Sequence, residues 1–198
     1  MLLLALVLPL SACFGDAERP VRVLFVGNSY THFNDMPGMV RALAGWVDRN
    51  VEVGTRAPNG WWWRDHASSA ETTDAIADGD WDFVVLQEQS MAPADRDLAR
   101  TVSFPAAQLL SRTVVGNGGD VVLFLTWGHR NGSAALGHDT FSAMQIDLAD
   151  SYLAFADSLL ADVAPVGMAW WMALAERPDI GLYQPDGSHP SVAGSYLA

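Results

Sequence analysis

The sequence contains no lysine and only one cysteine, Cys13. A single cysteine cannot form a disulfide within the chain. All 11 basic residues are arginines, and 23 acidic residues oppose them, giving a formal net charge of −12. No basic stripe is available to displace counterions from a nucleic-acid backbone, so the charge argues against a nucleic-acid partner.

Several catalytic and cofactor motifs are also missing. No Gly-x-Ser-x-Gly occurs, which argues against the nucleophile elbow of the α/β-hydrolases. The glycine-rich stretch 116–119 lacks the third glycine of a dinucleotide fingerprint, and there is no Walker A motif. His129, His138 and Asp139 do not follow a usual zinc spacing, so loop or capping roles are favoured for them. We therefore predict no metal and no cofactor.

The apolar run at the N-terminus is too short to span a bilayer. Leu2 to Leu10 has nine residues, which is the length of a signal-peptide core. Leu10-Ser11-Ala12-Cys13 follows it and resembles the lipobox of bacterial lipoproteins, in which the cysteine is acylated and becomes the first residue. An ordinary signal peptide cut after Ala12, or a misplaced start codon, is the alternative.

These features predict a signal peptide with a lipobox over residues 1–13 and a tether over residues 14–20. The folded part is then expected outside the cytoplasm, either secreted or attached to the bacterial cell envelope through lipid on Cys13. Membrane contact is expected only through this anchor. The oligomeric state stays open.

Residues 21–198 are long enough for one domain with one sizeable core. Buried strands are predicted at Val21–Val26, Val51–Val53, Asp82–Leu86, Asp120–Thr126 and Val163–Met168. Helices are predicted between and after them, at 36–47, 61–77, 93–115, 141–159 and 170–176, with Pro105 kinking or splitting the third. A last short helix after Ser191 is expected to be truncated.

The alternation of strands and helices, without hairpin signals, predicts a three-layer α/β/α sandwich. Right-handed crossovers make its five-stranded sheet parallel. A flavodoxin-like strand order of 2-1-3-4-5 places the switch point beside the first strand, where open α/β sheets bind their ligands.

Ser29 lies just past the carboxyl end of that first strand, after the turn-prone pair Gly27-Asn28. Far along the chain, Asp186 and His189 stand three residues apart in a loop, and one tight turn can bring the carboxylate under the imidazole. A serine hydroxyl needs a base that takes its proton. Ser29, His189 and Asp186 could therefore act as nucleophile, base and orienting acid. The alternative is that these residues only form turns.

Acyl transfer also needs donors for the developing oxyanion. At other strand ends, the Gly60 N–H and the side-chain amides of Gln87 and Gln89 are candidates. In an extended chain Gln87 and Gln89 share a side, so alternation does not decide between them.

Four segments stand in the order of the four blocks of the SGNH, or GDSL-like, hydrolase superfamily: Gly27–Thr31, Asn59-Gly60, Leu86–Ser90 and Asp186–Ser191. The chain resembles this superfamily from residue 21 to its end. The resemblance implies that Ser29 is the nucleophile, His189 the base and Asp186 the acid that orients it. It also implies that the Ser29 and Gly60 N–H groups form part of the oxyanion hole.

The third block departs from the usual Gly-x-Asn-Asp of the superfamily. Gln87-Glu88-Gln89-Ser90 stands there and resembles the Gln-containing version of some carbohydrate acetylesterases. We expect Gln87 to supply the amide donor, with Gln89 as the alternate.

Four other side chains are expected to contact substrate. Trp61, one of eight tryptophans, begins the run Trp61-Trp62-Trp63 directly after Gly60, and on a helix these three rings cannot all face the core. An exposed ring there could stack on a sugar or acyl chain; the alternative is that Trp62 or Trp63 packs inward while the others line the rim of the domain. Trp127 and Arg130 follow the fourth strand, and Arg130 could pair with a substrate carboxylate or with Asp139. His32 lies close to Ser29 in sequence.

The sequence therefore predicts a serine esterase that forms an acyl-enzyme. The expected substrate is a small-molecule or glycan ester, with a short acyl group such as acetyl on an extracytoplasmic carbohydrate. A lipid- or thioester-directed hydrolase is the alternative enzyme. A non-catalytic carbohydrate-binding lipoprotein and a structural envelope protein are the alternatives outside enzymes.

Overall fold

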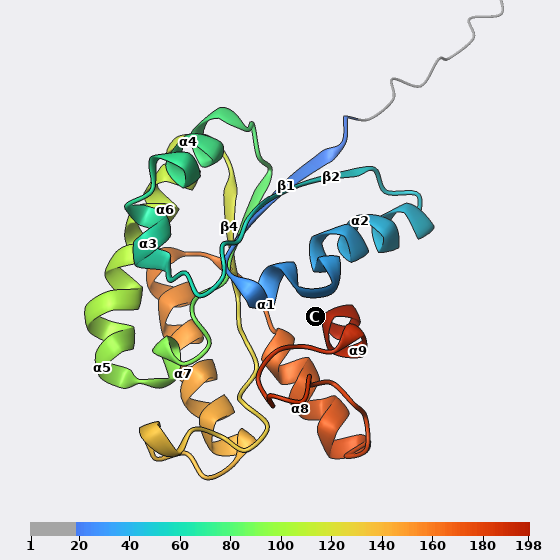
Figure 1. The fold of residues 1–198 in the computed structure, drawn as a ribbon. Helices are drawn as coiled ribbons and strands as arrows, with labels where there is room; N and C mark the ends of the chain where they lie inside the picture. The colour runs from blue at the N-terminus through green and yellow to red at the C-terminus, as the bar shows by residue number, and fades with distance from the viewer. Residues whose placement is uncertain (1–18) are drawn as a thin grey trace, which may run out of the picture.

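A computed structural model describes residues 19–198 as one parallel sheet with helices on both faces (Figure 1). The strand order is β2-β1-β3-β4-β5. This confirms the predicted three-layer α/β/α sandwich and its order. The predicted signal peptide, the lipobox with Cys13 and most of the tether lie outside the described residues. None of the helices found over 19–198 combines the length and the apolar character that a bilayer crossing requires.

The strands are β1 Val21–Val26, β2 Val51–Arg56, β3 Phe83–Leu86, β4 Asp120–Phe124 and β5 Asp162–Ala164. The α-helices are α1 Ser29–His32, α2 Met36–Trp46, α3 Trp63–Ala67, α4 Ala70–Asp78, α5 Arg96–Leu98, α6 Phe104–Gly116, α7 Phe141–Leu159, α8 Val166–Glu176 and α9 Val192–Leu197. Short 3₁₀ turns stand at Phe33–Asp35, Ala92–Ala94 and Ala134–Leu136, and a π-helical turn at Ala99–Ser103.

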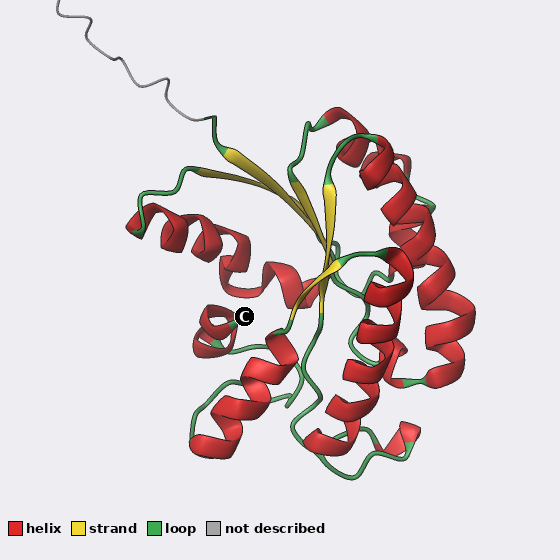
Figure 2. Cartoon of the chain, turned by 180° about the vertical axis from the view of Figure 1, so that it is seen from behind, coloured by secondary structure: helices red, strands yellow, loops and turns green. Residues whose placement is uncertain are grey.

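The central strands are apolar on both faces because helices cover both. In β1, Leu24 and Val26 pack in one core with side chains of α3, α4, α6 and α7. Phe25 points to the other face and packs in a second core with side chains of α2 and α8. Figure 2 shows these two groups of helices on opposite sides of the sheet. The unbroken apolar run of β1 follows from this double burial.

Among the boundaries that differ from the prediction, three have a clear local cause. The segment 61–77 forms two helices, since Ser69 accepts a hydrogen bond from the Thr72 N–H and caps a new helix. Pro105 occupies the first turn of α6, where its missing N–H costs nothing, and the π turn precedes it. Pro165 ends β5, so α8 begins earlier than predicted.

The loops that carry the predicted site meet at the carboxyl edge of the sheet. β1 is hydrogen-bonded to β2 on one side and to β3 on the other. The chain therefore crosses from one side of β1 to the other between β2 and β3. The crevice at this switch point is where open α/β sheets bind ligands. Ser29 begins α1 there, directly after β1.

Candidate active site

The three predicted catalytic side chains form one hydrogen-bonded line. Nε2 of His189 lies 2.9 Å from Oγ of Ser29, although the two residues are 160 positions apart. Nδ1 of the same imidazole lies 2.6 Å from Oδ2 of Asp186. A carboxylate at Nδ1 favours the tautomer whose Nε2 is free to accept the serine proton. The structure thus brings hydroxyl, imidazole and carboxylate together in the order that nucleophilic catalysis needs.

The loop 183–190 holds the carboxylate under the imidazole. Oδ1 of Asp186 accepts hydrogen bonds from the N–H groups of Ser188, at 2.9 Å, and His189, at 3.0 Å. Gly187 has a φ of +71°, which glycine adopts without strain. Slight burial acts to raise the pKa of Asp186, but its hydrogen bonds from Ser188 and His189 outweigh this and hold the pKa below its ordinary value. The carboxylate therefore stays ionised beside the base.

Two aromatic rings fix the orientation of the imidazole. The Phe33 ring stacks on the His189 ring with centroids 4.6 Å apart, and the Tyr30 ring meets it edge-on at 5.6 Å. Neither residue was predicted at the site from the sequence. Both follow Ser29 within about one helical turn, and this proximity is the signal that could have found them.

Gln87 does not face the site, and the preference for its amide as oxyanion donor is wrong. Its side chain is 1% exposed and lies beneath the nucleophile loop. Oε1 accepts hydrogen bonds from the Asn28 N–H and from the Thr31 hydroxyl, each at 2.9 Å, and Nε2 donates to the Glu88 carbonyl. A Cβ on Gly27 would collide with Thr31 and Gln87, so only glycine fits this crossing. Gln87 therefore holds the loop that carries Ser29.

A hollow of about 170 Å³ opens at Ser29. It is lined by Asn28, Ser29, Tyr30, Gly60, Gln89, Ser90, Ser188 and His189. Two predicted oxyanion candidates, Gly60 and the alternate amide Gln89, thus lie at the hollow. Gly60 has a φ of +72°. Oε1 of Gln89 accepts from the N–H groups of Met91 and Ala92, at 2.7 and 3.0 Å, and Nε2 lies 3.4 Å from Oγ of Ser90.

Asn28 connects the nucleophile loop to the Gly60 segment. Its Oδ1 accepts from the Tyr30 N–H at 3.1 Å and so caps α1. Its Nδ2 donates to the Trp61 carbonyl at 2.8 Å. The chain around Gly60 is therefore fixed relative to the residue before the nucleophile.

Comparison with solved structures identifies relatives of this arrangement. A protein from Slackia heliotrinireducens, assigned to the SGNH hydrolases, is 32% identical, and the match covers 90% of this chain and 95% of that one with a TM-score of 0.74. The chain belongs to the SGNH hydrolase family. Its fold and the order of its four sequence blocks agree with that membership.

Two further structures share the fold of this SGNH hydrolase. A DUF4886 family protein from Bacteroides uniformis is 16% identical over 90% of this chain and 79% of that chain, with a TM-score of 0.72. A variant of an acetyl-xylooligosaccharide esterase from Geobacillus is 18% identical over 89% of each chain, with a TM-score of 0.60. Comparisons with protein-family models and with curated proteins gave no match.

Two tryptophans expected at the substrate lie elsewhere in the SGNH hydrolase. Trp127 is 0% exposed and is stacked between Tyr30, at 4.5 Å, and Trp170, at 4.2 Å. Its indole N–H donates to the Ser188 carbonyl at 3.0 Å, so it supports the site from behind. Trp61 is half-buried, with its ring edge-on to His66 at 4.9 Å, and it lines a separate hollow.

Arg130 and His32 are both exposed and stand outside the lining of the Ser29 hollow. Arg130 donates to the Gln184 carbonyl at 3.0 Å, and its guanidinium lies 5.2 Å from the centre of the Tyr183 ring. This holds the loop that carries His189. Nε2 of His32 lies 2.7 Å from Oδ1 of Asn59, so the ring contacts the segment before Gly60.

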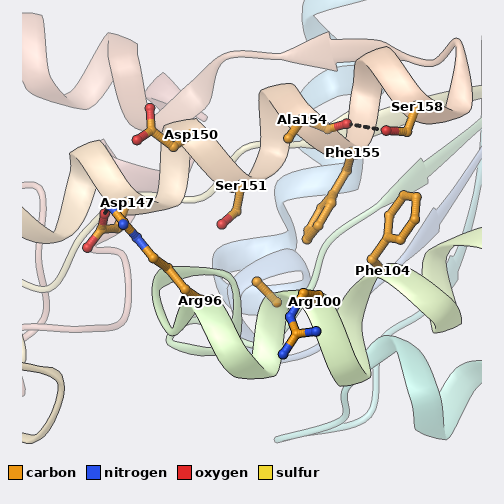
Figure 3. Close-up of a pocket in the computed structure, with 10 residues that line it drawn as sticks. Arg96, Arg100, Phe104, Asp147, Asp150, Ser151, Ala154, Phe155 and Ser158 are labelled. Carbon is orange, nitrogen blue, oxygen red and sulfur yellow. Dashed lines mark hydrogen bonds and ion pairs between the residues drawn. The ribbon is translucent and has the colours of Figure 1, made fainter.

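A second hollow, of about 460 Å³, lies between α5, α6 and α7 and shares no lining residue with the first (Figure 3). Its floor includes the stacked rings of Phe104 and Phe155, and Arg96 pairs with Asp147 at one end. Asp147 also contacts His138 at 2.8 Å.

Among residues 19–198, no three side chains of the His, Cys, Asp and Glu types are grouped closely enough to hold a metal ion.

Glu88 is a fully buried carboxyl behind the hollow. Its Oε1 accepts from the N–H groups of Trp63, at 2.9 Å, and Gln89, at 2.7 Å. One oxygen thus connects the segment after Gly60 to the third block. Burial raises the pKa of Glu88 to about 7, and these hydrogen bonds offset only part of that effect. From the sequence, Glu88 was identified only as part of the third block.

We expect this carboxyl to make the SGNH hydrolase less stable as pH rises. Between the ordinary glutamate pKa of 4.5 and the folded pKa of about 7, folded Glu88 binds a proton that the unfolded chain has lost. Stability therefore falls over this range, by on the order of 3 kcal/mol in total. Glu88→Gln imitates the protonated acid and lacks this pH dependence. Denaturant unfolding at pH 4.5 to 8 should show wild type losing stability relative to Glu88→Gln, and parallel curves would contradict the assignment.

Proposed function

We propose that this SGNH hydrolase is an extracytoplasmic serine esterase that removes short acyl groups, chiefly acetyl, from a carbohydrate. The observation that carries the proposal is the hydrogen-bonded line from Asp186 through His189 to Ser29, which ends at a small hollow. A protein that only bound carbohydrate would not need this line.

In the proposed reaction, His189 takes the proton from Ser29 while Oγ attacks the ester carbonyl. The oxyanion of the tetrahedral intermediate accepts hydrogen bonds from the N–H groups of Ser29 and Gly60 and from the amide of Gln89. His189 then gives its proton to the departing alcohol, leaving an acyl-enzyme. Water, activated by the same imidazole, releases the acid. Asp186 stabilises the imidazolium in both halves.

The size and polarity of the hollow favour a short acyl group. About 170 Å³ is small, and hydroxyl, amide and imidazole groups line much of it. A long hydrocarbon chain would leave those groups desolvated without hydrogen bonds, which costs about 1–3 kcal/mol for each. An acetyl-xylooligosaccharide esterase has the same fold, so a carbohydrate ester is compatible with it.

The position of the domain's N-terminus is compatible with a lipid anchor. Arg19 pairs with Asp82, beside the amino end of β1. Ser29 follows the carboxyl end of the same strand. An anchor at Cys13 would therefore leave the catalytic edge facing away from the point of attachment.

Ser29→Ala should abolish catalysis without unfolding the protein. We expect kcat/KM for p-nitrophenyl acetate to fall by at least about a thousandfold, because Ser29 carries the hydroxyl that is hydrogen-bonded to the His189 base. Ser158→Ala, an exposed serine-to-alanine change on α7, is the matched control and should keep wild-type activity. Equal rates in wild type and Ser29→Ala, with both folded, would remove the proposed mechanism.

Gln89→Glu separates two roles of Gln89. It keeps an oxygen that can accept from Met91 and Ala92 but removes the amide donor. If the amide stabilises the oxyanion, kcat should fall by about two to three orders of magnitude. Because glutamate also adds a negative charge beside the oxyanion, the decisive result is an unchanged kcat, which would remove Gln89 from the oxyanion hole.

Gln87→Ala is expected to lower the melting temperature, because it leaves the buried Asn28 N–H without its acceptor.

Cys13→Ser tests the proposed anchor. In the full-length chain expressed in a bacterium that processes lipoproteins, wild type should partition with membranes and Cys13→Ser with the soluble fraction. Metabolic labelling with a palmitate analogue should mark only the wild type. An unchanged fraction and no label on wild type would contradict the lipobox.

A further inference from the structure

One wall of the Ser29 hollow has no part in the proposed reaction. Ser90, Ser188 and Tyr30 form it, and the His129 imidazole lies against both serines. Nε2 of His129 is 3.3 Å from Oγ of Ser90 and 3.2 Å from Oγ of Ser188. The Tyr30 hydroxyl is 2.6 Å from Oγ of Ser188. These four side chains come from four separate segments and make one connected group, which we name the hydroxyl cluster.

The hydroxyl cluster has hydrogen-bonding capacity that its own contacts do not use. Each hydroxyl offers one donor and two acceptor sites, whereas Nε2 of His129 can form only one good hydrogen bond. Ser90 and Ser188 therefore compete for the same nitrogen, and acceptor sites remain on both. Since both serines line the hollow, a ligand bound there can reach these sites.

The cluster is matched to a neutral polar group. Burial lowers the pKa of His129, although the nearby Asp186 acts to raise it, so the imidazole is neutral at pH 7. Tyr30 is buried, and burial raises the pKa of its phenol. Because none of the four side chains carries a charge, a charged ligand group gains no ion pair from them. A hydroxyl group, which both donates and accepts, fits the unused sites.

The cluster lies beside the base, which protonates the departing alcohol in the proposed reaction. Ser188 directly precedes His189, and the Tyr30 ring is edge-on to the imidazole. His189 must pass its proton to the leaving oxygen, so the alcohol lies beside this imidazole. Gly60 and Gln89, proposed for the oxyanion, supply the other donors of the hollow.

We infer that the hydroxyl cluster binds a free hydroxyl group next to the ester oxygen, so that the preferred substrates are monoacyl esters of vicinal diols, as in a partly acetylated sugar ring. This inference rests on the proposed esterase function. An alcohol without the neighbouring hydroxyl leaves polar groups of the cluster desolvated and unpaired. Sites that hydrogen-bond a substrate hydroxyl discriminate strongly against the analogue that lacks it.

Three acetates that differ only in a hydroxyl test the inference: trans-2-hydroxycyclohexyl, trans-4-hydroxycyclohexyl and cyclohexyl acetate. Wild type should hydrolyse the first with a kcat/KM at least about tenfold above the other two, the effect of one good hydrogen bond. Ser188→Ala and Ser90→Ala should each lower this ratio towards one. Ser158→Ala, outside the hollow, should keep the wild-type ratio.

The outcomes separate the two proposals. If wild type does not hydrolyse p-nitrophenyl acetate, the esterase proposal and this inference both fail. If it does, but hydrolyses all three cyclohexyl esters equally, only the hydroxyl cluster is overturned. A preference that survives in both serine variants also overturns it. Thermal unfolding checks that each variant is folded. If either serine variant does not fold, the kcat/KM ratio of the esters is measured in His129→Asn instead, which keeps a neutral polar group.

Discussion

The hydrogen bond between Ser29 and His189 joins two loops that meet only in the folded chain, and one buried indole contacts both. Trp127 stacks on Tyr30, the neighbour of Ser29, and donates its N–H to the carbonyl of Ser188, the neighbour of His189. Its other face stacks on Trp170 of α8. Because such stacked rings are rigid and closely packed, Trp127 fixes the distance between the loops. The geometry of the hydrogen-bonded line therefore depends on a buried residue outside the Ser29 hollow.

Polar side chains buried below the site satisfy backbone groups that the sheet leaves unpaired. Strand ends at a sheet edge expose N–H and C=O groups that need partners away from water. Gln87 accepts the Asn28 N–H, Glu88 accepts two others, and Nε2 of His66 lies 2.8 Å from the Gly27 carbonyl. Burial of these polar side chains costs desolvation free energy, most of all for the carboxyl of Glu88. Their hydrogen bonds offset this cost and hold loops that apolar packing alone could not fix.

The sequence was sufficient for the fold and for the three residues of the hydrogen-bonded line. Double burial of β1 and the order of four blocks both depend on local patterns. The errors arise where local patterns do not decide. Alternation placed Gln87 and Gln89 on one side, but the strand ends at Leu86 and its period does not continue. Trp127 was expected at the substrate because it follows the fourth strand, whereas its stacking partners, Tyr30 and Trp170, are distant in sequence and leave no local pattern. His129 acquires its contacts from Ser90 and Ser188 by the same long-range folding.

The unusual third block distributes three tasks over three consecutive residues. Gln87 turns beneath the sheet edge and holds the nucleophile loop. Glu88 turns to the interior and holds the segment after Gly60 through the Trp63 N–H. Gln89 turns to the hollow, and its carbonyl oxygen meanwhile fixes the following turn. The three side chains thus fix the nucleophile loop, the segment after Gly60 and the turn that follows Ser90.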